Sequence, residues 1–526
     1  MSAAYSLDSI VVRGRRVFGW GFCLHPDGPI ARCRMRVPDI DGGESIIDLV
    51  PSGFRSDLRD AFPDLAHAAG AGFLVSAQLS KRIGRGDAAL LLTTKGGDEL
   101  MCSLPQFPDA YLAGSEVELG RGWSRFIEVV RRRGWMAAFR ASCSTLASRL
   151  RRHYSERVRL SRTQSNVAIV FDHHMGGGAN RYRQSRVSEL SKHGFTVVVA
   201  RPDLASLAYV SEWTHRDGRV VESRFVEQSA LLEELDRHRV AHVEINNLVG
   251  FEDPLALLDW ARAWRSGAKE RLLRYQLHDF HAACPSFTLI GVEGDHCGLP
   301  SPEVCRRCLP NNGRHTLGLQ TDVDVSEWRA RWTSFLRAAD ERIAFSRVSV
   351  TLMCRALPEI ADSDFAIQPH QTDVSQIRPV GASWADPVRV AAVGHLSHAK
   401  GASLVRKLAH RARERGLPIE FIVVGTLEGG STEAGPTLIT GSYRQGELSD
   451  VLERTRVGVV FLPSVCPETY SYLTDELMAT GLPLVALDLG APAERISLYP
   501  HGCLLPVSDQ DMQLDTLMRF IARVSP

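Results

Sequence analysis

The sequence predicts an α/β protein in which two doubly wound parallel-sheet domains follow a small antiparallel β-sandwich. Short alternating strands separated by turns fill residues 1–113, and from residue 165 onward buried strands alternate with helices. The polar stretch 371–387 interrupts that alternation and reads as an interdomain linker. We place the boundaries at 1–113 for the β-sandwich, 114–164 for an Arg-rich helical linker, 165–380 for the first parallel-sheet domain and 381–526 for the second.

Composition narrows the functional classes. The chain carries 62 Lys and Arg against 61 Asp and Glu, which leaves no general polyanion-binding charge. No apolar run approaches the ~20 residues that cross a bilayer, and the first residues lack the layout of a secretion signal. An odd number of cysteines, 11, favours reduced thiols over a disulfide framework. We therefore expect a cytoplasmic protein, with the inner face of the membrane as a more specific location.

The expected β-sandwich is the least informative part for function. Its clearest strands are 10–12, 17–22, 33–37 and 88–93. Apolar and polar residues alternate in 33–37, as expected where one face is packed and the other is wet. A module that binds carbohydrate or a partner and a module for packing or dimerisation both fit this pattern.

The linker 114–164 is strongly basic. Between Arg121 and Arg162 there are twelve arginines against two acids, Glu128 and Glu156. Trp123 and Phe126 begin an apolar series at helical spacing. A basic helix with large aromatics can lie on an anionic membrane surface through 121–162, or it can pack on a neighbouring domain as a linker. Nucleic acid is a poorer candidate, because no recognition module accompanies the arginines.

The first parallel-sheet domain opens with a strand at 167–171, a glycine loop, a helix at 182–193 and a strand at 196–200. The loop glycines Gly176, Gly177 and Gly178 let the backbone approach a bound group and leave amide donors free. Further strands are expected at 242–248 and 271–277. His278 follows the second of these, at the strand end where open α/β sheets bind ligands. A hydrogen-bonded core histidine is the competing interpretation.

A cysteine-rich insertion is expected at 281–313. It contains Cys284, Cys297, Cys305 and Cys308 in a C-x12-C-x7-C-x2-C array. In a reducing compartment four thiols at these separations suit a structural, tetrahedral Zn²⁺ site without an open coordination position. An iron–sulfur cluster and free thiols without metal are the alternatives.

The second domain contains the stretch around which the chain is organised. A strand at 459–462 precedes a helix expected from about Thr469 to Thr480, and a second strand follows at 484–487. Glu468 and Glu476 are separated by seven residues, which corresponds to roughly 12 Å of helix. The helix N-terminus between them favours an anion. This arrangement predicts one carboxylate for a sugar, one for a ribose, and a diphosphate between them.

These residues carry a family resemblance. Pro467-Glu468-Thr469-Tyr470-Ser471, with Glu476 and Gly481-Leu482-Pro483, resembles the E-x7-E signature of retaining GT-B glycosyltransferases, family 4 in particular. The resemblance covers roughly 165–526 and implies two Rossmann-like domains facing a cleft. Ser471 stands where the family usually carries a glycine. The GWGF segment at 19–22 is similar to accessory sandwich domains that precede some bacterial polysaccharide glycosyltransferases. The segment 278–308, with the pattern HDxxxxCP…C…CxxC, resembles a segment found in a subset of bacterial glycosyltransferases.

The resemblance implies specific roles. Glu468, His278 and Lys400 would be the catalytic residues, with Glu468 on the hydroxyls of the donor sugar. Lys400 matches a family lysine that clamps the diphosphate, and His395 stands at the position of the accompanying arginine. The residues implied in donor binding are Glu476, His395, Thr469, Tyr470, Ser471, Gly441, Tyr443, Gly176, Gly177 and Gly178.

The resulting functional hypothesis is hexose transfer, with retention, from a nucleotide diphosphate sugar to a hydroxyl acceptor, such as a growing bacterial surface polysaccharide or a lipid-linked glycan. No catalytic metal is expected, because fixed cations and amides would neutralise the leaving group and no obvious DxD motif is present. The alternatives are a sugar-nucleotide-binding scaffold without activity and a GT-B nucleotide-sugar epimerase. The sugar, the nucleobase, the linkage and the oligomeric state are left open by the sequence.

Overall fold

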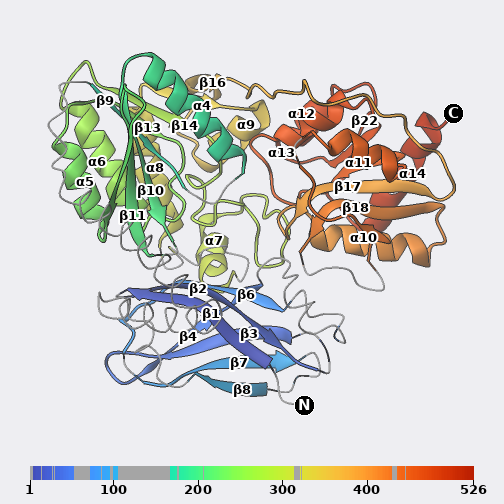
Figure 1. Ribbon diagram of the computed structural model, residues 1–526, viewed down its shortest axis with the longest axis horizontal. Coiled ribbons are helices and arrows are strands. Elements are labelled where there is room, and N and C mark those ends of the chain that lie inside the picture. The colour runs from blue at the N-terminus through green and yellow to red at the C-terminus, as the bar shows by residue number, and fades with distance from the viewer. Residues whose placement is uncertain are drawn as a thin grey trace, which may run out of the picture.

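Two antiparallel and two mostly parallel sheets organise the described part of the chain (Figure 1). The computed structural model describes residues 4–51, 65, 71–104 and 166–526, apart from gaps at 14, 27, 29, 85, 95–96, 98, 174–176, 205, 313–319, 321–322, 429–434 and 445. The predicted Arg-rich linker, 114–164, and its segment 121–162 lie outside these residues. Among the helices that are described, none is long and apolar enough to cross a membrane.

The N-terminal strands form two four-stranded antiparallel sheets, ordered β1-β2-β6-β5 and β4-β3-β7-β8. Both contribute to one apolar core that includes Val17, Met35, Val75 and Leu90, and together they form a sandwich. The strands are β1 (Ala4–Arg13), β2 (Arg16–Leu24), β3 (Ile30–Pro38), β4 (Glu44–Asp48), β5 (Val50–Pro51), β6 (Gly72–Gln78), β7 (Ala88–Thr94) and β8 (Glu99–Leu104).

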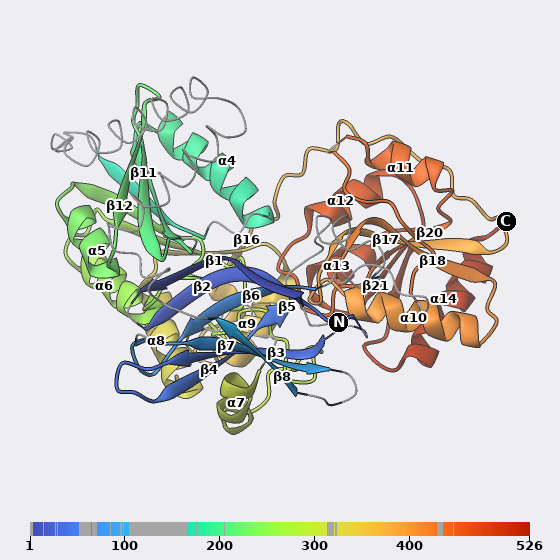
Figure 2. The same cartoon turned by 60° about the horizontal axis from the view of Figure 1, so that its bottom comes forward.

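A buried arginine attaches the sandwich to the first α/β domain. Arg16 Nη1 on β2 lies 3.3 Å from Glu252 Oε2 and 3.4 Å from the Tyr209 hydroxyl oxygen. The same hydroxyl accepts a hydrogen bond from the Glu252 backbone N–H at 3.2 Å. The sandwich therefore holds the loop at 246–253 of that domain. Figure 1 shows the sheets of the sandwich below the domain, and Figure 2 turns this lower side toward the viewer.

The first α/β domain contains an eight-stranded sheet of order β12-β11-β10-β9-β13-β14-β15-β16. Strands β10 to β16 of this order pair in parallel, whereas β11 and β12 add an antiparallel edge. The strands are β9 (Val167–Phe171), β10 (Thr196–Asp203), β11 (Ala208–Thr214), β12 (Val220–Phe225), β13 (Val240–Ile245), β14 (Leu272–Gln276), β15 (Glu341–Ala344) and β16 (Ala366–Ile367). The helices are α4 (Gly178–Lys192), α5 (Gln228–Asp236), α6 (Pro254–Ser266), α7 (Pro302–Cys308), η2 (Leu309–Asn311), α8 (Val325–Ala338), α9 (Arg347–Ala356) and η3 (Asp362–Asp364).

The second α/β domain contains a six-stranded parallel sheet of order β19-β18-β17-β20-β21-β22. The inner strands β18, β20 and β21 are largely buried on both faces, which agrees with their continuous apolar sequences. The strands are β17 (Val388–Leu396), β18 (Ile419–Leu427), β19 (Leu438–Ile439), β20 (Val459–Leu462), β21 (Leu484–Leu487) and β22 (Gly502–Leu505). The helices are α10 (Ala402–Glu414), α11 (Leu448–Arg454), α12 (Tyr472–Ala479), α13 (Gly490–Ile496) and α14 (Gln510–Val524).

Direct hydrogen bonds join the two α/β domains. Thr469 Oγ1 donates to the backbone carbonyl of His278 at 2.8 Å, and Ser346 Oγ donates to the Thr469 carbonyl at 3.1 Å. Glu494 accepts from the N–H groups of Arg347 and Val348, which begin α9 in the other domain. The two Rossmann-like domains therefore face each other, and the predicted α/β fold class with its GT-B arrangement and antiparallel N-terminal sheets is confirmed.

Two predicted helix starts were wrong. Helix α12 begins at Tyr472, because Ser471 is its N-cap and its Oγ accepts from the Thr474 N–H at 3.4 Å. Thr469 lies in a bend before the helix, and its side chain binds the other domain. The span between Glu468 and Glu476 is therefore not a continuous helix. Helix α4 begins earlier than expected, at Gly178, so that the last loop glycine belongs to its first turn.

Close backbone contacts at two glycines fix the loops around Glu468. A Cβ on Gly401 would lie 2.1 Å from the Pro463 carbonyl oxygen, and a Cβ on Gly490 would lie 2.5 Å from the Glu468 backbone nitrogen. Both residues have positive φ, 85° and 68°. Ala491 N–H also donates to the Glu468 carbonyl at 2.8 Å. The start of α13 therefore packs against the backbone of Glu468 and holds it in place.

Replacement of Gly490 by alanine tests this support. We expect Gly490→Ala to destabilise the protein by roughly 2–4 kcal/mol, because the positive φ and the overlap with Glu468 both oppose a Cβ. Gly416→Ala is the matched control: Gly416 has φ of 60° but no atom within 4 Å of its Cβ position, so it should cost only about 1 kcal/mol. Thermal unfolding of both variants provides the comparison, and equal losses would contradict the proposed close contact.

Candidate active site

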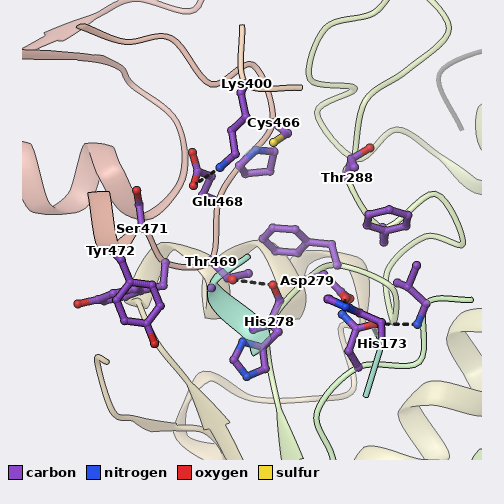
Figure 3. A pocket seen from close by; sticks show the side chains of 18 of the residues that line it. His173, His278, Asp279, Thr288, Lys400, Cys466, Glu468, Thr469, Ser471 and Tyr472 are labelled. Carbon is purple, nitrogen blue, oxygen red and sulfur yellow. Dashed lines mark hydrogen bonds and ion pairs between the residues drawn. The ribbon is translucent and has the colours of Figure 1, made fainter. Parts of the chain in front are cut away.

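A cavity of about 410 Å³ lies between the two α/β domains (Figure 3). Its wall in the first domain includes His173, Gly178, Asn247, His278, Asp279 and Thr288. Its wall in the second domain consists of Lys400 and the continuous segment 466–473. The carboxyl ends of β13 and β14 and the loop after β20 therefore open into one space, as expected for ligand sites in open α/β sheets.

An ion pair occupies the wall from the second domain. Lys400 Nζ lies 2.5 Å from Glu468 Oε2, with the Glu468 side chain 13% exposed and the Lys400 side chain 43% exposed. Burial opposes the charge of Lys400, but the Glu468 carboxylate raises the pKa of the amine. The second Glu468 oxygen accepts a hydrogen bond from Ser464. This pair places a fixed positive charge and a fixed carboxylate at the cavity surface.

Cys466 lies beside the ion pair and also lines the cavity. Burial raises the pKa of its thiol to about 11, with the Lys400 charge acting in the opposite direction and Glu468 adding to the rise. The side chain is therefore a neutral thiol at pH 7.

His278 lines the cavity from the first domain and is surrounded by rings. Tyr182 and Phe345 lie 4.8 Å and 4.5 Å from it between ring centres. Burial lowers the pKa of His278 well below its ordinary value, and His370 and His173 lower it further. Its Nε2 atom has no hydrogen-bond partner within the described residues. A neutral imidazole with an unused nitrogen can bind a substrate hydroxyl.

Asp279 is the second polar residue of this wall. Its Oδ1 accepts from the His281 N–H at 2.7 Å, and its Oδ2 accepts from the Asn247 side chain. Burial raises the pKa of Asp279 to about 7, the nearby Asp172 adds to the rise, and the two hydrogen bonds oppose it. The group therefore changes protonation state in the neutral pH range.

The three residues that follow Glu468 make different structural contacts. Thr469 holds the His278 carbonyl, and Ser471 caps α12. Tyr470 stacks on His370 with ring centres 4.4 Å apart, and its hydroxyl contacts the His370 carbonyl and Asp475. All three line the cavity, but the side chains of Tyr470 and Ser471 are already used in holding the local structure.

Glu476 does not line the described cavity, although it is close to it in sequence. It lies on α12 with its side chain 17% exposed, 3.7 Å from Arg181 Nη1 of the first domain. Burial raises its pKa, while Arg181 lowers it. Tyr443 is near Glu476: burial raises the tyrosine pKa to about 12, and the Glu476 charge contributes. Gly441, with φ of 82°, donates its N–H to the Gly425 carbonyl at 3.0 Å.

Only some of the remaining predicted site residues line the cavity. His395 is exposed, and its Nδ1 lies 2.5 Å from Thr426 Oγ1, so it does not line the cavity. Gly178 does line it, Gly177 precedes α4 with φ of 80°, and Gly176 lies outside the described residues.

The predicted zinc site is not supported. Within the described ranges, no group of three or more His, Cys, Asp or Glu side chains is placed to hold a metal ion, and this includes Cys284, Cys297, Cys305 and Cys308. Cys305 packs in an apolar cluster with Leu309 and Val325. Burial raises the pKa of Cys284 to about 12, and the neighbouring cysteines add to the rise. Cys284 and Cys305 therefore pack among apolar side chains in this loop.

Several residues that line the cavity were not predicted from the sequence as site residues, namely His173, Asn247, Thr288 and Cys466. For Asn247 a signal was present, because a polar Asn246-Asn247 pair directly follows the carboxyl end of β13. For Thr288 and Cys466 no local pattern marks the position.

Comparison with known proteins found a distant relative among glycosyltransferases. No family model matches the chain. The GDP-mannose-dependent alpha-mannosyltransferase of Mycobacterium tuberculosis (strain CDC 1551 / Oshkosh) is 24% identical over 242 residues. The match spans 44% of this chain and 61% of the length of that relative.

Solved structures with partial likeness include sucrose-phosphate synthase from Thermosynechococcus elongatus, with a TM-score of 0.43, 14% identity, and coverage of 68% of this chain and 90% of that one. HepE from Anabaena in complex with UDP and glucose gives a TM-score of 0.39 and 14% identity, with coverage of 69% and 90%. The fold assignment rests on the sheet topology of this chain itself.

The titration of Asp279 predicts a pH dependence of stability. Its pKa in the folded protein is about 7, above the ordinary value of 3.8, so the folded state holds a proton that the unfolded state has lost. This contribution is present at low pH and is lost as the pH rises toward and through 7. The free energy of unfolding of the wild type minus that of Asp279→Asn should therefore be larger at pH 5 than at pH 8, by roughly 2–3 kcal/mol at most.

Melting temperatures of both proteins at the two pH values measure this difference, and any constant cost of the substitution cancels. Asp515→Asn is the control, because the Asp515 side chain is 52% exposed and should leave the pH dependence unchanged. A difference between wild type and Asp279→Asn that does not vary with pH would contradict the raised pKa.

Proposed function

We propose that this protein is a retaining glycosyltransferase that moves a hexose from a nucleotide diphosphate sugar to a hydroxyl acceptor. The observation that carries the proposal is the Lys400–Glu468 pair on the wall of a cavity between two Rossmann-like domains. A fixed cation beside a carboxylate matches a ligand that joins an anionic diphosphate to a polyhydroxyl ring.

In this proposal the donor lies against the second domain. Lys400 and the backbone amides at the start of the eight-residue helix α12 bind the diphosphate. Glu468 accepts hydrogen bonds from the sugar hydroxyls, and Glu476 accepts those of the ribose. Tyr443, which lies near Glu476, and Gly441 border the nucleobase. Because Lys400 and the amides carry the charge of the leaving group, we propose that transfer is independent of a metal.

In the transfer step the bond between the anomeric carbon and the diphosphate oxygen breaks while the bond to the acceptor oxygen forms on the same face. The acceptor proton passes to the leaving diphosphate oxygen, so that no protein nucleophile is required. Lys400 stabilises the negative charge that develops on the diphosphate. The neutral His278 binds a hydroxyl of the transferred sugar through a ring nitrogen, without adding a positive charge next to the oxocarbenium-like centre.

The acceptor occupies the wall from the first domain. His173, Asn247, Asp279 and Thr288 offer several hydrogen-bonding groups there, which suits a hydroxyl-rich glycan. We propose a growing bacterial polysaccharide or a lipid-linked glycan as the acceptor, with the basic stretch 121–162 on an anionic membrane surface. The N-terminal sandwich is then an accessory domain, and Arg16 couples it to the loop after β13.

A nucleotide diphosphate sugar as the donor is further supported by the distant relative, which is a GDP-mannose-dependent alpha-mannosyltransferase. GDP-mannose is therefore the first donor to test, followed by UDP-glucose. A sugar-nucleotide-binding scaffold is the second candidate, and two observations favour it: His395 points to Thr426 instead of the cavity, and the Ser471 hydroxyl is used as a helix cap.

Substitution of Glu468 separates transfer from binding. We expect Glu468→Gln to lower turnover by about 100- to 1000-fold, because glutamine retains the bond from Ser464 but loses the charge that favours the transition state. Donor affinity should change less than about tenfold. Release of nucleoside diphosphate in the presence of a glycan acceptor measures turnover, and calorimetry measures binding.

Glu414→Gln, a substitution of a half-exposed surface carboxylate on α10, is the matched control and should behave as the wild type. If the wild type binds a donor but transfers from none, the scaffold is favoured. If Glu468→Gln turns over at the wild-type rate, the proposed catalytic role of this carboxylate is wrong.

A further inference from the structure

Arg181 of the first domain reaches across to the second domain. It lies in the first turn of α4, and its Nη1 atom is 3.7 Å from Glu476 Oε1 on α12. The guanidinium carbon lies 4.6 Å from the centre of the Tyr472 ring. Burial lowers the pKa of His370, whose imidazole borders the cavity, to about 3, and the charge of Arg181 contributes to the decrease. A positive charge from the first domain is therefore held beside the donor wall of the second.

The packing of two helix faces brings Arg181 to this place. Gly178 lies against Tyr472, because a Cβ there would be 3.1 Å from a carbon of the ring. Arg181 is three residues after Gly178, and Glu476 is four residues after Tyr472, so each pair shares one face of its helix. The contact between Gly178 and Tyr472 therefore aligns Arg181 with Glu476. A larger residue at position 178 would separate the two faces.

The proposed donor site needs more positive charge than Lys400 alone provides. A diphosphate carries several negative charges, whereas Lys400 is a single cation that already pairs with Glu468. The ring of His395, which the sequence offered as the second cation, is exposed and already bonded to Thr426 Oγ1. A guanidinium binds phosphate oxygens through two parallel N–H groups and stays charged at all relevant pH values.

The contact between Arg181 and Glu476 is loose enough for the guanidinium to bind another group. At 3.7 Å its distance to Glu476 exceeds that of a charge-assisted hydrogen bond, about 2.7–2.9 Å. Its side chain is 37% exposed, so it can turn without disturbing the core. Ribose hydroxyls bound to Glu476 would take the place that the guanidinium now occupies.

We propose that Arg181 is a donor-binding residue that moves from Glu476 to the diphosphate when the ribose binds Glu476. This inference rests on the proposed function, since it concerns the same donor site. Arg181 then supplies the second cation from the opposite domain, and donor binding draws the two domains together. The competing role is that of a block: if Arg181 only occupies the ribose position, its removal should strengthen binding.

The experiment compares a nucleoside diphosphate with its nucleoside. UDP, GDP and ADP are titrated into the full chain by calorimetry, and the tightest of them is then compared with the corresponding nucleoside in competition. We expect Arg181→Gln to weaken nucleoside diphosphate binding by about tenfold to hundredfold and to leave nucleoside binding within about threefold. Arg181→Lys, which retains charge without the planar fork, should give an intermediate affinity.

Arg219→Gln is the matched control, because Arg219 lies in an exposed turn next to Asp217 and should leave both affinities unchanged. Equal or tighter diphosphate binding by Arg181→Gln overturns the inference while leaving the proposed function intact. Equal weakening for diphosphate and nucleoside also overturns it, since the effect would not depend on phosphate. A wild-type chain that binds no nucleoside diphosphate overturns both proposals.

Discussion

The ion pair between Lys400 and Glu468 is the interaction on which the candidate site depends. Bringing an ammonium group and a carboxylate together at a partly buried surface costs desolvation, and the cost is met only where both groups are held in close contact. The chain achieves this by backbone packing. Gly401 lies on Pro463, Gly490 lies on Glu468, and neither position has room for a Cβ. The loops after β17 and β20 therefore present the pair as one rigid unit.

The segment after Glu468 connects this unit to the other domain. Glu468 itself turns to the cavity, Thr469 binds the carbonyl of His278, and Ser471 begins α12. The position of Glu468 relative to His278 is thus fixed by the hydrogen bond from the Thr469 side chain to the His278 backbone carbonyl. Glu494 strengthens the same junction by capping α9. A ligand in the cavity would contact both domains within a few residues of their shared hydrogen bonds.

Several features could be predicted from the sequence because they are local. Continuous apolar runs such as 167–171 and 459–462 identified the buried parallel strands, and the position of His278 after a strand placed it at the ligand edge. The antiparallel edge of β11 and β12 was missed, since its alternation depends on which face packs. The start of α12 was missed because the Thr469 side chain is held outside the helix by a hydrogen bond to a residue 191 positions away.

Other features were beyond sequence reasoning because they arise from tertiary packing. The spacing of four cysteines indicated zinc, yet Cys305 joins an apolar cluster with Leu309 and Val325. The polarity of Asp279 was visible, but its raised pKa results from burial near Asp172. Arg181 carries no sequence signal at all, and only the contact of Gly178 with Tyr472 brings it to Glu476.

The most direct test of the central claim is a crystal structure of the chain with an intact nucleotide diphosphate sugar. We expect diphosphate oxygens within hydrogen-bonding distance of Lys400 Nζ and sugar hydroxyls on the Glu468 carboxylate, in the cavity between the two α/β domains. A nucleotide sugar bound elsewhere, or bound in the cavity without contact to either member of the pair, would contradict the central claim.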